Sequence, residues 1–258
     1  MNHLSSTFPD PKGTRLRYQC WEESSKGYGR IALLLHGLGR HSGSFPSLVP
    51  QLVAARYKVY AFDFPGFGAS PGERGAGGAV AMADAVEALY RRIESMEGAR
   101  EIDLVAHSMG VVAALLFLKR YPARRPDLAA VAPLLFGTPM DARPEAFHEP
   151  GEGPAATEAA PDASIPAAFA ADLDATAKDL LADPGFLEGR KAAFFVGESD
   201  PLVPLDRLER AVEGLPLGRK RVVSLPRERH DPFGGRKAER LGSALIAWFD
   251  ETESGRPA

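Results

Sequence analysis

The sequence predicts an α/β protein whose mainly parallel sheet is covered by helices on both faces. Short runs typical of buried strands alternate along the chain with longer stretches whose apolar residues recur at helical spacing. Two of the short runs, residues 31–35 and 192–196, are apolar throughout, as expected of strands that are covered on both sides. Polar motifs directly follow several of these runs. The chain of 258 residues contains no internal repeat, and it is long enough for one such domain with a large core.

The predicted elements follow one another in a regular order. An opening hairpin pairs residues 5–8 with residues 15–21 through a turn that contains proline and glycine. Six further strands complete a sheet of eight and are expected at residues 31–35, 58–62, 102–106, 128–136, 192–196 and 221–225. Helices are expected at residues 45–55, 80–94, 109–121, 204–212 and 236–248.

Residues 106–110 read Ala-His-Ser-Met-Gly and lie between a predicted strand and a predicted helix. A sharp turn from strand to helix projects its central side chain, here Ser108, and points the helix N-terminus at it. Such a turn needs small residues two positions before and two positions after the serine, and Ala106 and Gly110 stand there. We therefore predict that Ser108 is a nucleophile. The alternative is that Ser108 only caps the helix that follows.

Three further motifs follow predicted strands, at the sheet edge where ligands bind in open parallel sheets. The motif His-Gly-Leu-Gly at residues 36–39 can present the Leu38 amide, with the Met109 amide as its partner, to a developing oxyanion. Asp200 and His230 each follow a later strand. We expect His230 to act as the general base toward Ser108 and Asp200 to orient it.

Four motifs together resemble those of the α/β-hydrolases. They are residues 36–45, 62–75, 106–110 and 197–203. Within that superfamily the chain is most similar to the monoacylglycerol lipase and lysophospholipase-like group, from about residue 14 to residue 249 with the exception of residues 141–189. The chain order Ser, Asp, His is also the order expected of this fold. This group usually has a second glycine where Val111 stands, and Gly-His-Gly where residues 66–68 read Gly-Phe-Gly.

The resemblance implies the α/β-hydrolase fold with a short cap inserted into it. Hydrolases of this group insert a cap where residues 141–189 stand, so residues 1–140 and 190–258 are expected to form the core domain. The inserted segment is rich in Ala, Pro, Glu and Asp and carries eleven acidic residues against Arg143 and Lys178. We expect it to form a lid over the site, and the alternative is a solvated acidic insertion.

The spacing of apolar residues differs between the two parts of this segment. Residues 144–166 are expected to be irregular. Residues 167–181 can form an amphipathic helix, with Phe169 and Leu173 on or near its apolar face. These two side chains, with His107 and Val203, are the predicted substrate-binding residues.

Other polar residues near the motifs have simpler explanations. Asp63 follows a strand and is a rival to Asp200, but the resemblance implies that this position supports its own loop. Asp206 and Asp231 are expected at a helix start or on the surface. Of the histidines, His36 is expected to be structural or to line the pocket, and His41 to hold its loop by hydrogen bonding.

Composition excludes several classes of protein. The formal net charge of −3 gives no electrostatic footprint for nucleic acid. No cluster of residues has metal-ligand spacing, no motif binds a dinucleotide or phosphate, and neither a metal nor a cofactor is expected. Cys20 is the only cysteine, so no intrachain disulfide can form. The longest apolar run, residues 111–118, is too short to cross a bilayer, and the N-terminus lacks a signal-peptide pattern. A cytoplasmic monomer or homodimer is expected.

These observations predict a serine hydrolase that cleaves a small-molecule acyl ester in two steps. Monoacylglycerols or lysophospholipids follow from the resemblance, and a small acidic cap equally suits short neutral esters. The same triad also serves acyltransferases, thioesterases, peptidases and C–C hydrolases. A third alternative is a non-catalytic binding protein with this fold, which would not need to keep Ser108, Asp200 and His230 together.

Overall fold

The computed structural model describes residues 1–23, 27–98, 100–136 and 166–253. The strands are β1 (Asn2–Pro9), β2 (Arg15–Glu22), β3 (Arg30–Leu35), β4 (Tyr57–Phe62), β5 (Ile102–His107), β6 (Leu128–Val131), β7 (Lys191–Gly197) and β8 (Arg219–Leu225). The α-helices are α1 (Val49–Ala54), α2 (Gly78–Glu97), α3 (Met109–Arg120), α4 (Ala167–Ala182), α5 (Leu205–Glu213) and α6 (Gly235–Glu253). Two short 3₁₀ helices are η1 (Leu134–Phe136) and η4 (Pro184–Leu187).

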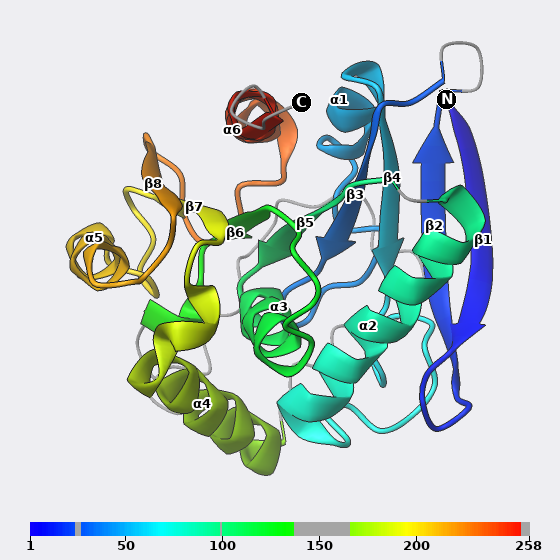
Figure 1. The fold of residues 1–258 in the computed structure, drawn as a ribbon, viewed down its shortest axis with the longest axis horizontal. Coiled ribbons are helices and arrows are strands. Elements are labelled where there is room, and N and C mark those ends of the chain that lie inside the picture. The colour runs from blue at the N-terminus through cyan, green and yellow to red at the C-terminus, as the bar shows by residue number, and fades with distance from the viewer. Residues whose placement is uncertain (24–26, 99, 137–165, 254–258) are drawn as a thin grey trace.

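All eight strands form one sheet in the order β1-β2-β4-β3-β5-β6-β7-β8 (Figure 1). The β1–β2 and β2–β4 pairs are antiparallel, and every pair from β4 to β8 is parallel. The predicted α/β class and the mostly parallel sheet are therefore confirmed. Because β3 to β8 all run in one direction, the loops after β3, β5, β7 and β8 emerge at the same edge of the sheet.

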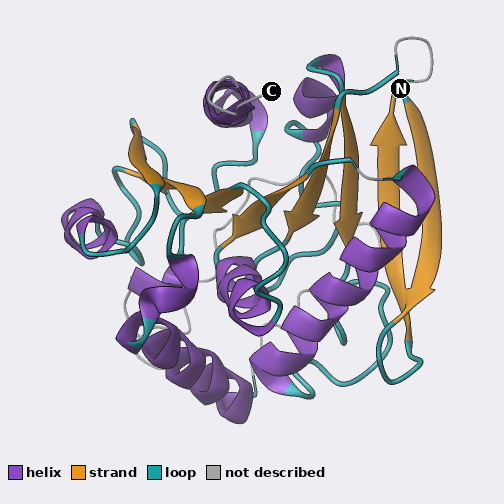
Figure 2. Ribbon diagram, viewed as in Figure 1, coloured by secondary structure: helices purple, strands orange, loops and turns teal. Residues whose placement is uncertain are grey.

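Helices cover both faces of the sheet, as Figure 2 shows. On one face, α1 and α6 pack on strand side chains such as Leu34 and Ala61. On the other face, α2 and α3 pack on the alternate side chains, such as Leu33 and Tyr60. The period of two along each strand thus divides the core into two layers, and it explains why the central strands are apolar throughout.

Most element boundaries agree with the sequence-based expectation, and three do not. The helix predicted at residues 236–248 continues to Glu253. The strand predicted at residues 128–136 ends at Val131, and η1 takes up its last residues. Ala132 has a φ of 46° and a proline follows it, so the backbone cannot continue in a ladder. The helix predicted at residues 45–55 begins only at Val49, because Pro50 occupies its first turn and favours a start there. The irregular stretch predicted at residues 144–166 lies almost wholly outside the described residues.

Helix α4 lies beside α2, α3 and η1, and the expected helix at residues 167–181 is confirmed (Figure 1). Its side chain Asp172 accepts a hydrogen bond from the Ala79 amide, at 2.7 Å, in the first turn of α2. A Cβ atom on Gly78 would lie 2.3 Å from the same carboxylate oxygen. Because the first turn of α2 contains no acidic residue of its own, α4 supplies the negative charge that a helix N-terminus favours. Such a cap is worth roughly 1 kcal/mol.

No helix among the described residues combines the length and the apolar character that crossing a lipid bilayer would require.

Candidate active site

Ser108 lies at a strained turn between β5 and α3. Its φ is 53° and its ψ is −116°, a combination that residues other than glycine rarely adopt. The amide of Ser108 donates to the Val131 carbonyl at 2.9 Å, which holds the turn against β6. A Cβ atom on Gly110 would lie 2.7 Å from the carbonyl oxygen of Leu35. The turn therefore has the predicted strain, and only glycine fits two residues after Ser108.

The side chains of Ser108, His230 and Asp200 form a chain of two hydrogen bonds. Ser108 Oγ lies 2.8 Å from His230 Nε2, and His230 Nδ1 lies 2.9 Å from Asp200 Oδ2. The His230 and Asp200 side chains are 11% and 0% exposed, so bulk water scarcely competes for these bonds. The other Asp200 oxygen, Oδ1, accepts the Leu202 and Val203 amides at 2.8 and 3.1 Å. The structure thus brings together the three side chains that the sequence singles out.

The loops that carry Asp200 and His230 pack closely on one another. Gly197 ends β7, and a Cβ atom there would lie 2.3 Å from the carbonyl oxygen of Glu228. That same carbonyl accepts the Ser199 amide at 2.9 Å. The close approach of the two loops therefore depends on glycine at position 197, and it sets the distance between the Asp200 carboxylate and the imidazole of His230.

The rival carboxylates lie elsewhere. Asp63 accepts the Ser42 and Ala69 amides at 2.6 and 2.9 Å, so it supports the loops after β3 and β4, as expected. Asp206 pairs with Arg210 on the exposed side of α5. Asp231 does not simply lie on the surface, as the sequence suggested, because its side chain is 19% exposed and pairs with Arg40.

The predicted oxyanion turn lies directly against Ser108. The Arg40 amide donates to the Gly37 carbonyl at 3.2 Å and closes the turn. A Cβ atom on Gly37 would lie 3.0 Å from Ser108 Cβ, so this position also requires glycine. The turn carries the Leu38 amide, and Met109 begins α3 directly after the nucleophile candidate. The binding of an oxyanion by these two amides stays a prediction.

Two buried histidines support the site in their neutral form. His36 Nδ1 lies 2.8 Å from the Gly37 carbonyl, and its Nε2 accepts the Phe64 amide at 3.1 Å. His107 Nε2 lies 3.0 Å from the carbonyl oxygen of His230 and donates to it. Burial lowers the pKa of His36 and of His107 to about 4, because it penalises the charged imidazolium. His107 therefore acts as a neutral donor that holds the backbone of His230.

We expect these two histidines to make the protein less stable as the pH falls from 7 to 5. The unfolded chain binds protons at both positions below its histidine pKa of 6.5, whereas the folded protein does not until about pH 4. The free energy of unfolding is thereby lowered by about 2 kcal/mol for each histidine at pH 5. Urea unfolding at the two pH values measures it.

Between pH 7 and pH 5, the free energy of unfolding should fall less in the variant His107→Gln than in the parent. The difference between the two decreases should be about 2 kcal/mol. Glutamine keeps a donor for the His230 carbonyl but does not titrate, and carboxylate titration is common to both proteins and cancels. Equal pH dependence of His107→Gln and the parent would contradict a neutral buried His107.

The predicted substrate-binding residues lie on α4 (Phe169 and Leu173), at the end of β5 (His107) and in the loop after β7 (Val203). Phe169 and Leu173 of α4 are 3% and 1% exposed and belong to the core layer of α2 and α3. The Phe169 ring lies 6.1 Å from the Phe67 ring. Val203 is buried, and its amide donates to Asp200. Substrate contacts of these residues stay a prediction.

Three contacts in the structure could not be foreseen from the sequence. They are the Arg40–Asp231 ion pair, the cap of α2 by Asp172, and the approach of Phe67 to Phe169. Each joins residues far apart in the chain, and no local pattern relates them. Among the described residues, no group of three or more His, Cys, Asp or Glu side chains could hold a metal ion.

Comparison with known proteins places the chain in a family. Residues 29–184, more than half of the chain, match the family described as Serine aminopeptidase, S33. A serine hydrolase-like protein of Danio rerio is 37% identical over 124 residues, which cover 47% of this chain and 36% of that protein. The monoglyceride lipase of Homo sapiens is 29% identical over 118 residues, which cover 43% of this chain and 37% of the lipase. The matched stretches thus span little more than a third of either relative.

A similar fold occurs in the crystal structure of a soluble variant of monoglyceride lipase from Saccharomyces cerevisiae in complex with a substrate analogue. That structure has a TM-score of 0.76 at 17% identity, and the alignment covers 96% of this chain and 94% of the other. The chain therefore belongs to the serine aminopeptidase S33 family, and it is an α/β-hydrolase of the serine hydrolase type that resembles monoacylglycerol lipases.

Proposed function

We propose that this protein cleaves carboxylic esters through an acyl-enzyme, with Ser108 as nucleophile, His230 as general base and Asp200 as the carboxylate that orients it. The observation that carries the proposal is the chain of two hydrogen bonds from Ser108 through His230 to Asp200. It stands at a strained turn with a helix N-terminus beside it. A serine that only caps a helix needs neither an imidazole nor a carboxylate behind it.

In the first step, Ser108 Oγ attacks the ester carbonyl carbon while His230 Nε2 takes its proton. Asp200 accepts a hydrogen bond from the Nδ1–H group of His230 throughout, so it fixes the tautomer and stabilises the imidazolium without taking the proton. The negative charge that develops on the carbonyl oxygen is bound by the Leu38 and Met109 amides, each worth about 3 kcal/mol in related chemistry. The tetrahedral intermediate collapses when His230 returns the proton to the leaving alcohol, and an acyl ester on Ser108 remains.

In the second step, His230 takes a proton from water, whose oxygen attacks the acyl carbon. The tetrahedral intermediate again uses the two amides, and its collapse returns a proton from His230 to Ser108 Oγ. The products are the alcohol and the carboxylic acid. The buried Asp200 carboxylate, with its second oxygen held by two backbone amides, keeps the imidazole in place through both steps.

For the substrate we propose neutral esters such as monoacylglycerols. The similarity to proteins named monoglyceride lipase supports this class. The acidic residues of segment 141–189 support it too, because negative charge near an entrance repels anionic esters. We further propose that this segment is a cap on a core domain of residues 1–140 and 190–258, since α4 packs beside α3 and η1.

The cap proposal predicts that Phe169→Ala changes the acyl-chain preference. Removal of the ring leaves space beside Phe67 in the layer between α4 and the core, which longer or branched acyl groups can fill. A series of p-nitrophenyl esters from acetate to laurate measures the preference. Reactivity toward a small fluorophosphonate should stay within about threefold of the parent, since Ser108 and His230 are untouched. An unchanged chain-length profile in a folded variant would contradict the cap proposal.

The proposed function is tested by fluorophosphonate labelling together with a substrate panel. The panel contains neutral acyl esters, acyl thioesters and aminoacyl anilides, with and without an acceptor alcohol. The anilides are included because the family description names an aminopeptidase. Labelling with fastest turnover of the esters in water supports the proposal. Faster turnover of thioesters or anilides, or transfer to the alcohol, would assign the same triad to another reaction, and no labelling would favour a binding protein.

A further inference from the structure

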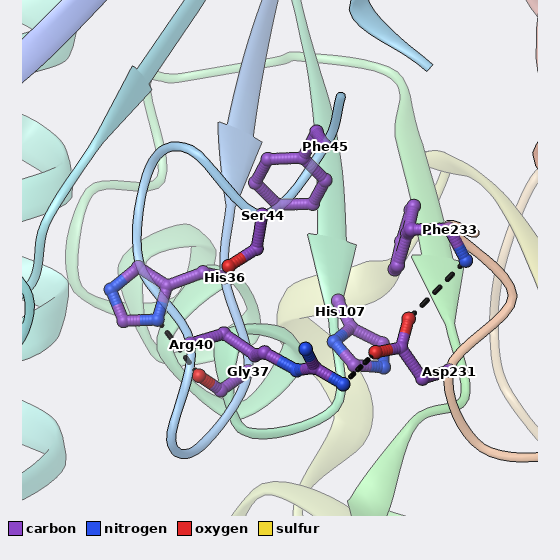
Figure 3. A pocket seen from close by; sticks show the side chains of 8 residues that line it. All are labelled: His36, Gly37, Arg40, Ser44, Phe45, His107, Asp231 and Phe233. Carbon is purple, nitrogen blue, oxygen red and sulfur yellow. Dashed lines mark hydrogen bonds and ion pairs between the residues drawn. The ribbon is translucent and has the colours of Figure 1, made fainter. Parts of the chain in front are cut away.

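One ion pair joins two loops that both border Ser108. Arg40 closes the oxyanion turn, and its guanidinium Nη2 contacts Asp231 Oδ2 (Figure 3). Asp231 is the residue directly after His230 in the chain. The ion pair therefore connects the backbone that carries the Leu38 amide to the backbone that carries the imidazole.

Each partner is oriented by its own loop. The Arg40 amide is bound by the Gly37 carbonyl at 3.2 Å, so its position in the turn is defined. Asp231 Oδ1 accepts the Phe233 amide at 3.2 Å, which leaves Oδ2 to face the guanidinium (Figure 3). Because the Arg40 backbone and the Asp231 carboxylate are each held by their own loop, the contact between the two side chains ties the two loops together.

Packing beside the ion pair also holds the loop that bears His230. Arg40, Asp231, His107 and Phe233 line one small pocket (Figure 3). The Phe233 ring lies 5.0 Å from the ring of His107. His107 in turn donates to the carbonyl of His230. The loop that bears the imidazole is thus held from β5 on one side and from the oxyanion turn on the other.

Exposure decides what this pair can do. The Arg40 and Asp231 side chains are 38% and 19% exposed, so solvent screens their attraction. Such pairs contribute at most about 1 kcal/mol to the free energy of unfolding. An error of about 1 Å in the position of a catalytic group, in contrast, can lower a rate by up to about 100-fold. The consequence of losing the pair is therefore expected in turnover and not in stability.

We propose that Arg40 and Asp231 are positioning residues that keep the oxyanion turn and His230 at fixed positions relative to Ser108. The proposal rests on the proposed ester hydrolysis and deepens it. During attack, the Leu38 amide has to reach the carbonyl oxygen while the imidazole reaches the serine proton. Both requirements are met at once only if the two loops keep a fixed separation.

The test is a double-mutant cycle of Arg40→Gln and Asp231→Asn in the full chain. Asparagine keeps an acceptor for the Phe233 amide and removes only the charge. A short neutral p-nitrophenyl ester gives kcat and KM separately, and a fluorophosphonate gives the rate of labelling. The matched control is Arg210→Gln, which removes an exposed ion pair of the same kind, 2.7 Å from Asp206 on α5.

We expect each single variant to lower kcat and the labelling rate about tenfold, with KM within about twofold. The double variant should be no worse than the singles, because either change already breaks the pair. Arg40→Lys should recover part of kcat, since it restores a charge that Asp231 can bind. The control should behave as the parent, and every thermal midpoint should stay within about 4 °C of the parent value.

Three results with the variants would overturn the proposal. Additive losses, or none, would show that the two side chains do not act as a pair. A rise of KM confined to esters that carry a carboxylate or phosphate would make Arg40 a recognition residue. A larger fall of the thermal midpoint would make the pair a support of the fold. A parent that neither labels nor hydrolyses any ester would overturn the proposed function and this inference with it, whereas an active parent with unaffected variants overturns this inference alone.

Discussion

Replacing Ser108 by alanine is expected to lower ester turnover by about five to six orders of magnitude and to abolish fluorophosphonate labelling. The members of a serine triad act as a unit, so the loss of the nucleophile removes the contribution of His230 and Asp200 as well. The oxyanion amides and the binding of substrate would leave only a small residual rate. The measurements are kcat for a p-nitrophenyl ester and the stoichiometry of labelling by intact-protein mass spectrometry.

The matched control is Ser243→Ala on the exposed side of α6. The Ser243 hydroxyl donates to a backbone carbonyl of its own helix, and it should be dispensable for turnover. A Ser108→Ala protein that is still labelled at another serine and keeps full turnover would refute the assignment of the nucleophile.

Replacing Asp200 by asparagine is expected to lower kcat about 10⁴-fold with little change in the fold. Two backbone amides, of Leu202 and Val203, donate to Oδ1 of this side chain, so the amide oxygen of asparagine has to stay there. Its NH₂ group then faces Nδ1 of His230, where a carboxylate oxygen now lies at 2.9 Å. That contact favours the tautomer with the proton on Nε2, which cannot accept the proton of Ser108.

The kcat of a short ester, measured beside the thermal midpoint, checks this prediction. Asp206→Asn is the control, because it makes the same chemical change at an exposed position on α5. An Asp200→Asn protein that retains more than about a tenth of the parent kcat would contradict the assignment of the acid. A comparable loss of kcat in Asp206→Asn would point to a general effect of charge.

Much of this structure follows from short-range patterns. The strands are recognisable because buried strands are apolar throughout, and the helices because their apolar residues recur at helical spacing. Ser108, Asp200 and His230 could be grouped before any contact was known, since parallel strands deliver the loops at their carboxyl ends to one edge. The strained dihedral angles of Ser108 follow from the same turn.

The remaining features depend on contacts between distant segments. The early end of β6 is set by the positive φ of Ala132. Alanine rarely adopts this conformation, so the sequence gives no sign of it. Asp231 could be a surface residue or an ion-pair partner, and only the approach of Arg40 decides which. Nothing in the composition of residues 167–181 indicates that one of its several acids, Asp172, would reach the start of another helix.

That contact of Asp172 limits how freely the proposed cap could be exchanged with the corresponding segment of a related hydrolase. An amide in the first turn of α2, that of Ala79, donates its hydrogen bond to a side chain of α4. A chimera with a foreign segment in place of α4 would therefore leave the Ala79 amide without this partner. The proposed core domain and the proposed cap are therefore not independent modules where α4 meets α2. A graft that provides a carboxylate at the same place should preserve the start of α2, and one that does not should let this end of the helix fray.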